Sequence, residues 1–108
     1  MGKFLVSKRS NGEHQFNLVA DNSEIILTSE GYTTRAACEN GIESVKENSV
    51  FDEAYDRKLS TNGKPYFNLK AKNSQVIGTS QMYESSSSME KGIDSVRRNA
   101  PEAEVTEK

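Results

Sequence analysis

The sequence has no tryptophan, one cysteine, one histidine and two prolines among its 108 residues. One cysteine cannot form an internal disulfide, and one cysteine with one histidine cannot supply the usual zinc ligand sets. No apolar run approaches the roughly 20 residues of a membrane-spanning helix, and the N-terminal apolar segment is too short for a signal-peptide core. The charge is nearly balanced, with 14 basic and 16 acidic residues. We therefore expect a small soluble cytoplasmic protein without a metal or cofactor.

The short motifs of common enzyme classes are also missing. The seven glycines form neither a Walker loop nor a dinucleotide-binding fingerprint, and there is no HExxH pair and no nucleophile elbow. His14 lies beside a predicted turn and Cys38 lies on a predicted apolar helix stripe. Neither position has the neighbours that activate a general base or a thiolate nucleophile. We expect a protein that is not an enzyme.

An internal repeat organises the chain. Comparing residues 4–48 with residues 55–99, at an offset of 51 and without gaps, gives 18 identities in 45 positions. Solenoids need at least three units to bury a continuous core, so two units should close on each other as one pseudo-two-fold domain. We expect residues 1–50 to form the first repeat, residues 51–101 the second, and residues 102–108 a disordered acidic tail.

Each repeat begins with the pattern of a β-hairpin. Asn11-Gly12 and Asn62-Gly63 lie between strand-like segments, and Asn-Gly supplies the two positive φ angles of a type I′ turn. Alternation of apolar and polar residues predicts one buried face on the strands. That face contains Phe4, Val6, Phe16, Leu18 and Ala20 in the first repeat and Tyr55, Leu59, Phe67, Leu69 and Ala71 in the second.

A third strand and a helix follow in each repeat. The strands are expected at residues 24–29 and 75–80, after tight turns. The apolar spacing then changes to i, i+4, i+7, which predicts a helix with Thr or Ser N-caps. The helices should end at Asn48 and Asn99 in a left-handed conformation. Gly41 and Gly92 fall on the buried side of these helices, so we expect a close packing contact there. The resulting class is α+β: a duplicated β-β-β-α unit with antiparallel strands and two helices.

Three segments of the second repeat resemble a known family. They read Phe-Asn-Leu-Lys-Ala at 67–71, Val-Ile-Gly-Thr-Ser at 76–80 and Gly-Ile-Asp-Ser-Val-Arg at 92–97, and they look like the repeat motif of the YegP-like family of small bacterial proteins. The resemblance covers essentially the whole chain, in both copies. It implies the α+β fold built from a β-β-β-α duplication, and it supplies no catalytic residues.

Polar residues that are identical in the two repeats are candidates for binding. We select Tyr32 and Tyr83, at the predicted strand-to-helix junctions, together with Asn17 and Asn68 on the predicted strands. Loop positions on a rigid scaffold often bind partners, and a tyrosine offers an apolar ring with a polar tip. The structural alternative is that these tyrosines lay their rings on the core with the hydroxyl outside.

A second candidate is a basic surface in the second repeat. Four lysines surround Tyr66 in the predicted hairpin, and this arrangement is typical of a stacking platform for single-stranded nucleic acid. These lysines are Lys58, Lys64, Lys70 and Lys72. The sequence pI of about 5.5 opposes binding of a polyanion.

These observations favour a non-catalytic cytoplasmic monomer that binds a protein or a small ligand through two repeat-related surfaces. The alternative is a nucleic-acid-binding protein that uses the Lys and Tyr face of the second hairpin. No partner can be identified from the sequence.

Overall fold

Each repeat folds as three antiparallel strands followed by a helix, as the computed structural model shows for residues 2–107. Met1 and Lys108, the ends of the predicted first repeat and tail, lie outside the described residues. The first repeat forms β1 (Lys3–Lys8), β2 (His14–Val19), β3 (Ile25–Thr28) and α1 (Arg35–Asn48). After η1 (Asp52–Ala54), the second forms β4 (Tyr55–Leu59), β5 (Pro65–Lys70), β6 (Val76–Thr79) and α2 (Ser86–Asn99).

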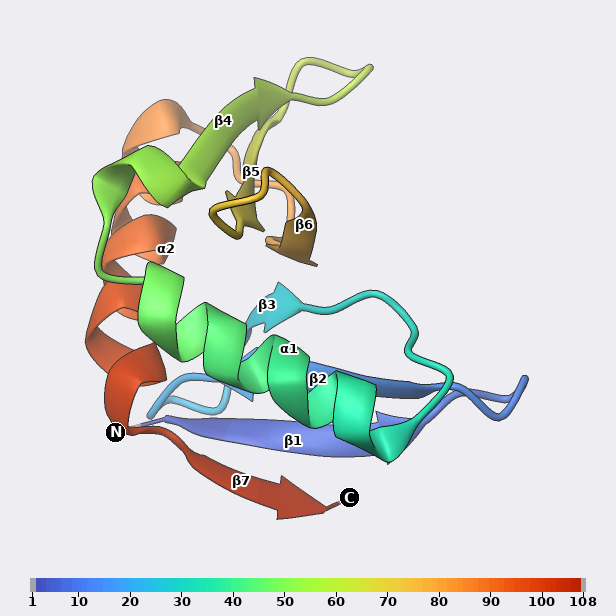
Figure 1. Cartoon of the computed structure of the whole chain (residues 1–108). Helices are drawn as coiled ribbons and strands as arrows, with labels where there is room; N and C mark the ends of the chain where they lie inside the picture. The colour runs from blue at the N-terminus through green and yellow to red at the C-terminus, as the bar shows by residue number, and fades with distance from the viewer. Residues whose placement is uncertain (1, 108) are drawn as a thin grey trace.

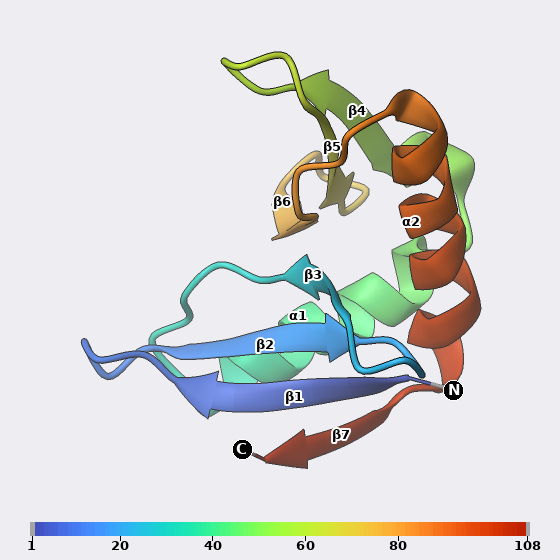
Figure 2. The same ribbon diagram turned by 180° about the vertical axis from the view of Figure 1, so that it is seen from behind.

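All strands join one sheet in the order β4-β5-β6-β3-β2-β1-β7. The two repeats meet where β3 pairs with β6, and the one register pair there is Thr28 with Thr79. These threonines occupy equivalent positions in the two repeats, so a pseudo-two-fold axis passes between them. Figures 1 and 2 show the strands of the two repeats on either side of this junction, where the sheet bends strongly. The duplicated α+β architecture is confirmed.

Both helices pack on the same face of the sheet and share one core. The apolar stripes of α1 and α2 are buried against the inward-facing residues of the strands. Each helix also contacts strands of the other repeat: α1 contacts β5 and β6, and α2 contacts β3. The opposite face of the sheet has no helix over it within residues 2–107. No helix of this region is long and apolar enough to cross a membrane.

The C-terminal segment differs from the expected disordered tail. After η2 (Ala100–Glu102), residues Glu104–Glu107 form β7, which pairs in parallel with β1. Ala100 and Ala103 are buried where the segment leaves α2. The acidic composition predicts a disordered tail. The edge of β1, however, offers unpaired backbone N–H and C=O groups, and hydrogen bonds to these groups stabilise the four residues as a strand despite their composition.

The turns also differ from the expected type. Gly12 and Gly63 have positive φ values of 88° and 82°, whereas Asn11 and Asn62 do not. The N–H of Gly12 donates to the carbonyl of Arg9 (2.9 Å), and the N–H of Arg9 donates to the carbonyl of Glu13 (2.7 Å). This is a three-residue hairpin loop with its last residue in the left-handed region. The type I′ prediction is therefore wrong.

Two other local expectations are wrong. Leu59 is 70% exposed, because it ends the edge strand β4 beyond the reach of α2. Asn48 and Asn99 end the helices as predicted, but neither has a positive φ. Their side-chain amides instead donate to the carbonyls of Ser44 and Ser95, each at 2.8 Å. The helix ends are closed by backbone bonds from the following residues, with the N–H groups of Ser49 and Ala100 donating to the carbonyls of Val45 and Val96.

Candidate functional site: the open face of the sheet

A row of polar residues crosses the middle of the face that has no helix. On β2, Asn17 alternates with buried Phe16 and Leu18, so its side chain points away from the core. Directly opposite residues on neighbouring strands share a face, and the register extends this position across the junction. The four residues, which we call the polar row, are Asn17, Thr28, Thr79 and Asn68 on β2, β3, β6 and β5.

The pseudo-two-fold axis relates one half of the polar row to the other half. Asn17 is equivalent to Asn68, and Thr28 is equivalent to Thr79. The Thr79 hydroxyl donates to Oδ1 of Asn68 at 2.8 Å. Asn17, Asn68 and Thr79 are half-buried and Thr28 is exposed. The structure therefore brings together two of the predicted binding residues, Asn17 and Asn68, and adds the two threonines, which the sequence analysis missed.

A shallow hollow of about 640 Å³ lies over the junction between β3 and β6. The hollow includes Thr28 and Thr79 of the polar row, the buried serines Ser29 and Ser80, and Ile25, which is 48% exposed. The amides and hydroxyls here donate and accept hydrogen bonds, and Ile25 offers apolar area. This chemistry favours binding over bond-making, because a hydroxyl without an activating base is a weak nucleophile.

The predicted tyrosines lie elsewhere, on the helix side of the sheet. The Tyr32 ring stacks on Phe16 with centroids 6.3 Å apart, and the Tyr83 ring stacks on Phe67 at 6.4 Å. Burial raises the pKa of both hydroxyls. Within residues 2–107, the buried Tyr83 hydroxyl makes no hydrogen bond.

Each tyrosine hydroxyl lies against a helical glycine. A Cβ added at Gly41 would come 2.8 Å from Cζ of Tyr32, and one added at Gly92 would come 2.5 Å from Cζ of Tyr83. Both glycines are buried, which confirms that they lie on the packed side of the helix. The geometry favours the structural interpretation of the tyrosines, although the hydroxyls point into the helix contact rather than outward. A binding role for them stays a prediction.

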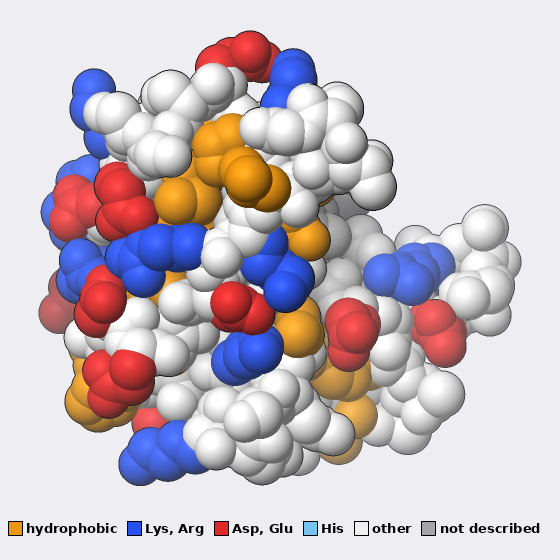
Figure 3. Space-filling model, turned by 90° about the horizontal axis from the view of Figure 1, so that it is seen from above, with side chains coloured by type: hydrophobic (Ala, Val, Ile, Leu, Met, Phe, Trp, Pro, Cys, Tyr) orange, Lys and Arg blue, Asp and Glu red, His pale blue; other side chains and the backbone are white. Residues whose placement is uncertain are grey.

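Carboxylates neutralise much of the proposed basic platform. Lys58 lies directly opposite Tyr66, but the carboxylate of Asp56 is 3.6 Å from its ammonium and 3.1 Å from that of Lys70. These lysines hold the pKa of Asp56 below its usual range. Figure 3 shows acidic and basic side chains interspersed over the face seen from above. This arrangement lacks the single-sign surface that attracts nucleic acid.

The other two lysines of the platform are Lys64 and Lys72. Lys64 forms an ion pair with Glu84 at 2.8 Å, which lowers the pKa of that carboxyl. Lys72 lies in the turn between β5 and β6, beside a pocket of about 450 Å³ that also includes Phe51. Three of the four lysines, Lys58, Lys64 and Lys70, are thus paired with carboxylates.

His14 and Cys38 lie in structural positions. His14 is the first residue of β2 rather than a turn residue, and its backbone exchanges two 2.7 Å hydrogen bonds with that of Tyr32. Cys38 is fully buried in the core, and burial raises the pKa of its thiol. A buried protonated thiol behaves as a small apolar side chain.

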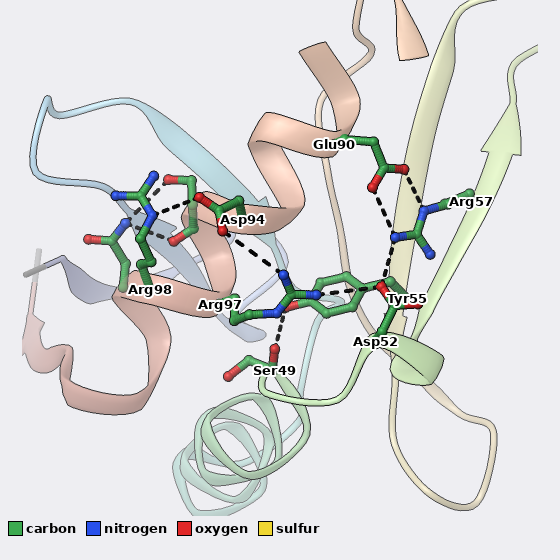
Figure 4. A network of polar contacts seen from close by, with 10 residues as sticks. Ser49, Asp52, Tyr55, Arg57, Glu90, Asp94, Arg97 and Arg98 are labelled. Carbon is green, nitrogen blue, oxygen red and sulfur yellow. Dashed lines mark hydrogen bonds and ion pairs between the residues drawn. The ribbon is translucent and has the colours of Figure 1, made fainter. Parts of the chain in front are cut away.

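The structure also reveals an ion-pair network beside β4 that the sequence analysis missed (Figure 4). The Arg57 guanidinium binds both oxygens of Glu90, at 2.6 and 3.0 Å, and Asp52 at 2.9 Å. Arg97 reaches Asp52 at 3.5 Å and lies over the Tyr55 ring at 5.8 Å. A sequence signal existed: Arg57 occupies the position of buried Val6 in the first repeat. A charge at a core-facing position predicts a partner on the facing helix.

Comparisons with known proteins place the chain in a family. The model described as "Domain of unknown function (DUF1508)" matches residues 10–56 and 60–107. A UPF0339 protein of Acinetobacter baylyi is 53% identical over 104 residues, which cover 96% of this chain and 94% of that protein. A UPF0339 protein in the ptx operon 5′ region of Stutzerimonas stutzeri is 50% identical over 106 residues, with 98% and 96% covered.

Two solved structures have the same fold. The solution NMR structure of yegP from E. coli, a protein of unknown function, matches with a TM-score of 0.94 at 49% identity over 98% of this chain and 91% of that one. A UPF0339 protein of Shewanella oneidensis matches with a TM-score of 0.93 at 47% identity, with 98% and 90% covered. The chain therefore belongs to the UPF0339 family of YegP-like proteins, built from two DUF1508 repeats.

Proposed function

We propose that this protein is a non-catalytic binding module that holds another protein on the open face of its sheet. The observation that supports this most directly is the polar row, which crosses the pseudo-two-fold axis beside the hollow at the β3 and β6 junction. A partner placed there meets equivalent groups from both repeats, and two linked contacts strengthen each other.

The shape of this face favours a protein over a small ligand. Small-molecule sites are concave, mostly apolar and bury most of the ligand. The hollow instead lies on an open strand surface and combines Ile25 with hydroxyl and amide groups. Such a mixture is typical of the surface of a non-obligate protein interface.

Nucleic acid is the weaker alternative. The lysines near Tyr66 are paired with Asp56, and the formal net charge of the chain is −2. A strand surface with paired charges releases few counterions on binding a phosphate backbone. We expect a monomer in the bacterial cytoplasm whose partner is a protein.

The test uses a photo-crosslinking amino acid at Thr28 or Thr79 in the full chain, expressed in native bacterial cells. The control places the same amino acid at Glu43, an exposed position on α1 on the opposite side of the molecule. We expect one protein to be crosslinked from both threonine positions, but not from Glu43, after nuclease treatment.

The double substitution Thr28→Arg and Thr79→Arg should prevent the tagged chain from capturing this partner. A retained partner would contradict the proposal, as would equal crosslinking from Glu43. A capture that disappears with nuclease treatment would favour the nucleic-acid alternative.

A further inference from the structure

Two pockets lie at equivalent places in the two repeats, each between the segment that follows a helix and the turn that joins the second and third strands. One has a volume of about 450 Å³ and includes Lys72 of the turn between β5 and β6. The other has a volume of about 320 Å³ and includes Asp21 of the turn between β2 and β3. Lys72 and Asp21 occupy equivalent positions in the repeats, so the same pocket occurs twice with different side chains.

The larger pocket, which we call the linker pocket, combines apolar groups with opposite charges. Phe51, which is 42% exposed, Ala54 and Ala71 supply the apolar groups. Glu53 lies in η1, on the linker between α1 and β4, and Lys72 lies on the turn that faces it across the pocket. A concave space of this volume, with apolar walls and a few polar groups, is typical of a small-molecule site.

The charges of Glu53 and Lys72 are not neutralised within the chain. Among residues 2–107, neither side chain forms an ion pair, with the other or with a third residue. Lys70 also borders the linker pocket, but its ammonium lies 3.1 Å from the carboxylate of Asp56. The pocket therefore presents one unpaired carboxylate and one unpaired ammonium, which belong to different elements and stand apart.

The counterpart pocket in the first repeat has a different set of groups. Asp21 replaces Lys72 on the turn, and Glu102 stands where the linker pocket has its aromatic ring. The cation of the counterpart pocket, Lys3, occupies the position of Ala54. A ligand with a negative group would meet a carboxylate on the turn there, so the two pockets should differ in what they bind.

We propose that the linker pocket binds a free α-amino acid with an apolar side chain. The Lys72 ammonium and the Ser74 hydroxyl donate to the ligand carboxylate, and the Glu53 carboxylate accepts from the ligand ammonium. The Phe51 ring contacts the apolar side chain of the ligand. A zwitterion pairs both charges of the pocket at once, whereas a ligand with one charge leaves the other unpaired. The linker pocket shares no residue with the polar row or the hollow, so either proposal can fail alone.

The test is an NMR titration of the isotope-labelled full chain with three compounds that share a phenyl ring. L-Phenylalanine has both charges, phenylpropionate has the carboxylate alone, and phenethylamine has the ammonium alone. We expect phenylalanine to cause saturable shifts of the amides of residues 48–54 and 70–74. We also expect it to bind about fivefold more tightly than either analogue.

Charge variants show which group holds which end of the ligand. Lys72→Gln should weaken binding of phenylalanine about fivefold without weakening that of phenethylamine, which has no carboxylate. Glu53→Gln should weaken binding of phenylalanine by a similar factor without weakening that of phenylpropionate, which has no ammonium. Glu104→Gln, at the equivalent place in the counterpart pocket, is the control and should leave all three affinities unchanged.

Glu53 and Lys72 are exposed, so these variants should fold as the wild type does, and their amide spectra check this. No saturable shift by about 20 mM phenylalanine would overturn the proposal. Shifts confined to other residues, equal affinity of the three compounds, or unaffected binding of phenylalanine by either Lys72→Gln or Glu53→Gln would each overturn it as well.

Discussion

The first and second repeats place different residues at the axis that relates them. Leu27 in β3 is fully buried there, and its counterpart in β6 is Gly78. A Cβ added at Gly78 would come 2.6 Å from Cγ of Leu27. Two large side chains cannot occupy the same space beside the axis. Leu27 of the first repeat therefore fills this space, and Gly78 of the second repeat has no side chain there. Leu27 and Gly78 thus differ because the two copies meet at this position.

Away from the axis, the repeats keep the contacts that each unit needs locally. The buried hydroxyls of Ser29 and Ser80 accept the N–H groups of Phe16 and Phe67, at 2.9 and 3.0 Å. Each hydroxyl also donates to the next carbonyl, at 2.8 Å. These contacts satisfy backbone groups where the third strand ends. The identity of these two serines therefore reflects a requirement inside each repeat, whereas the difference between Leu27 and Gly78 reflects the contact between the repeats.

The largest expected effect comes from separating the repeats. Residues 1–50 and 51–108, prepared as two fragments, should each fail to form a stable monomer, because each helix packs on strands of both repeats. An equimolar mixture should recover the helical circular dichroism signal and cooperative melting of the whole chain. A concentration-independent cooperative transition from residues 1–50 alone would contradict this prediction.

Exchanging the axis residues tests the divergence directly. Gly78→Leu should lower the free energy of unfolding by about 3 kcal/mol, because the new side chain overlaps Leu27. The double variant Leu27→Gly with Gly78→Leu should regain at least half of this loss, measured by urea denaturation. A double variant no more stable than Gly78→Leu would show that the two positions do not share one space.

The glycine and tyrosine pairs should respond alike in both repeats. Alanine is favoured over glycine in a helix by about 1 kcal/mol, yet Gly41→Ala should destabilise by about 1 kcal/mol because its Cβ overlaps the Tyr32 hydroxyl. In a Tyr32→Phe background the same change should cost less, because the hydroxyl is gone although Cζ of the ring still lies 2.8 Å from the added Cβ. Gly92→Ala with Tyr83→Phe should behave in the same way, and Asn40→Ala at an exposed helix position is the control. A thermal melt that shows Gly41→Ala to be stabilising in the wild-type background would refute the contact.

The smallest effect is the acid sensitivity of the network beside β4, where Arg57 stands at the position of Val6 in the first repeat. The Arg57 guanidinium holds the pKa values of Asp52 and Glu90 below their usual range. This stabilisation is present above the unfolded-state pKa of about 4 and is lost as the pH falls through the lower folded-state values.

Glu90→Gln should therefore destabilise by about 0.5 kcal/mol at pH 7, as is usual for exposed pairs, and by less at pH 3. Urea midpoints of the variant and the wild type at both values measure this, with Glu47→Gln on the exposed side of α1 as the control. A difference between the two chains that persists unchanged at pH 3 would contradict the assignment.

Local patterns were sufficient for the elements of each repeat. The apolar spacing predicted the helix ends at Asn48 and Asn99, and Thr34 and Ser85 cap the helices by accepting the N–H groups of Ala37 and Ser88, at 3.0 and 3.1 Å. Simple alternation did not predict that Ile26 and Leu27 are both buried. The register shifts between Leu18 and Val19, because a bulge places two successive residues over one partner.

The candidate site was predictable only in part. Asn17 and Asn68 were selected because they are identical in the two repeats, but nothing in one repeat indicates that Thr28 and Thr79 would lie between them. Their adjacency depends on the antiparallel pairing of β3 with β6 across the axis. The same holds for the network beside β4, since Arg57 and Glu90 are 33 residues apart in the chain.

The sequence by itself determined the β-β-β-α unit, its duplication, the helix caps and the buried glycines, because these depend on side-chain periodicity and on hydrogen bonds between residues close in the chain. Only the tertiary structure decided which strands meet, that Glu104–Glu107 add to β1, and that β4 has β5 as its one neighbouring strand within residues 2–107. Strand pairing joins backbone groups that all residues share, so its partners are selected by the packing of the whole core rather than by a local pattern.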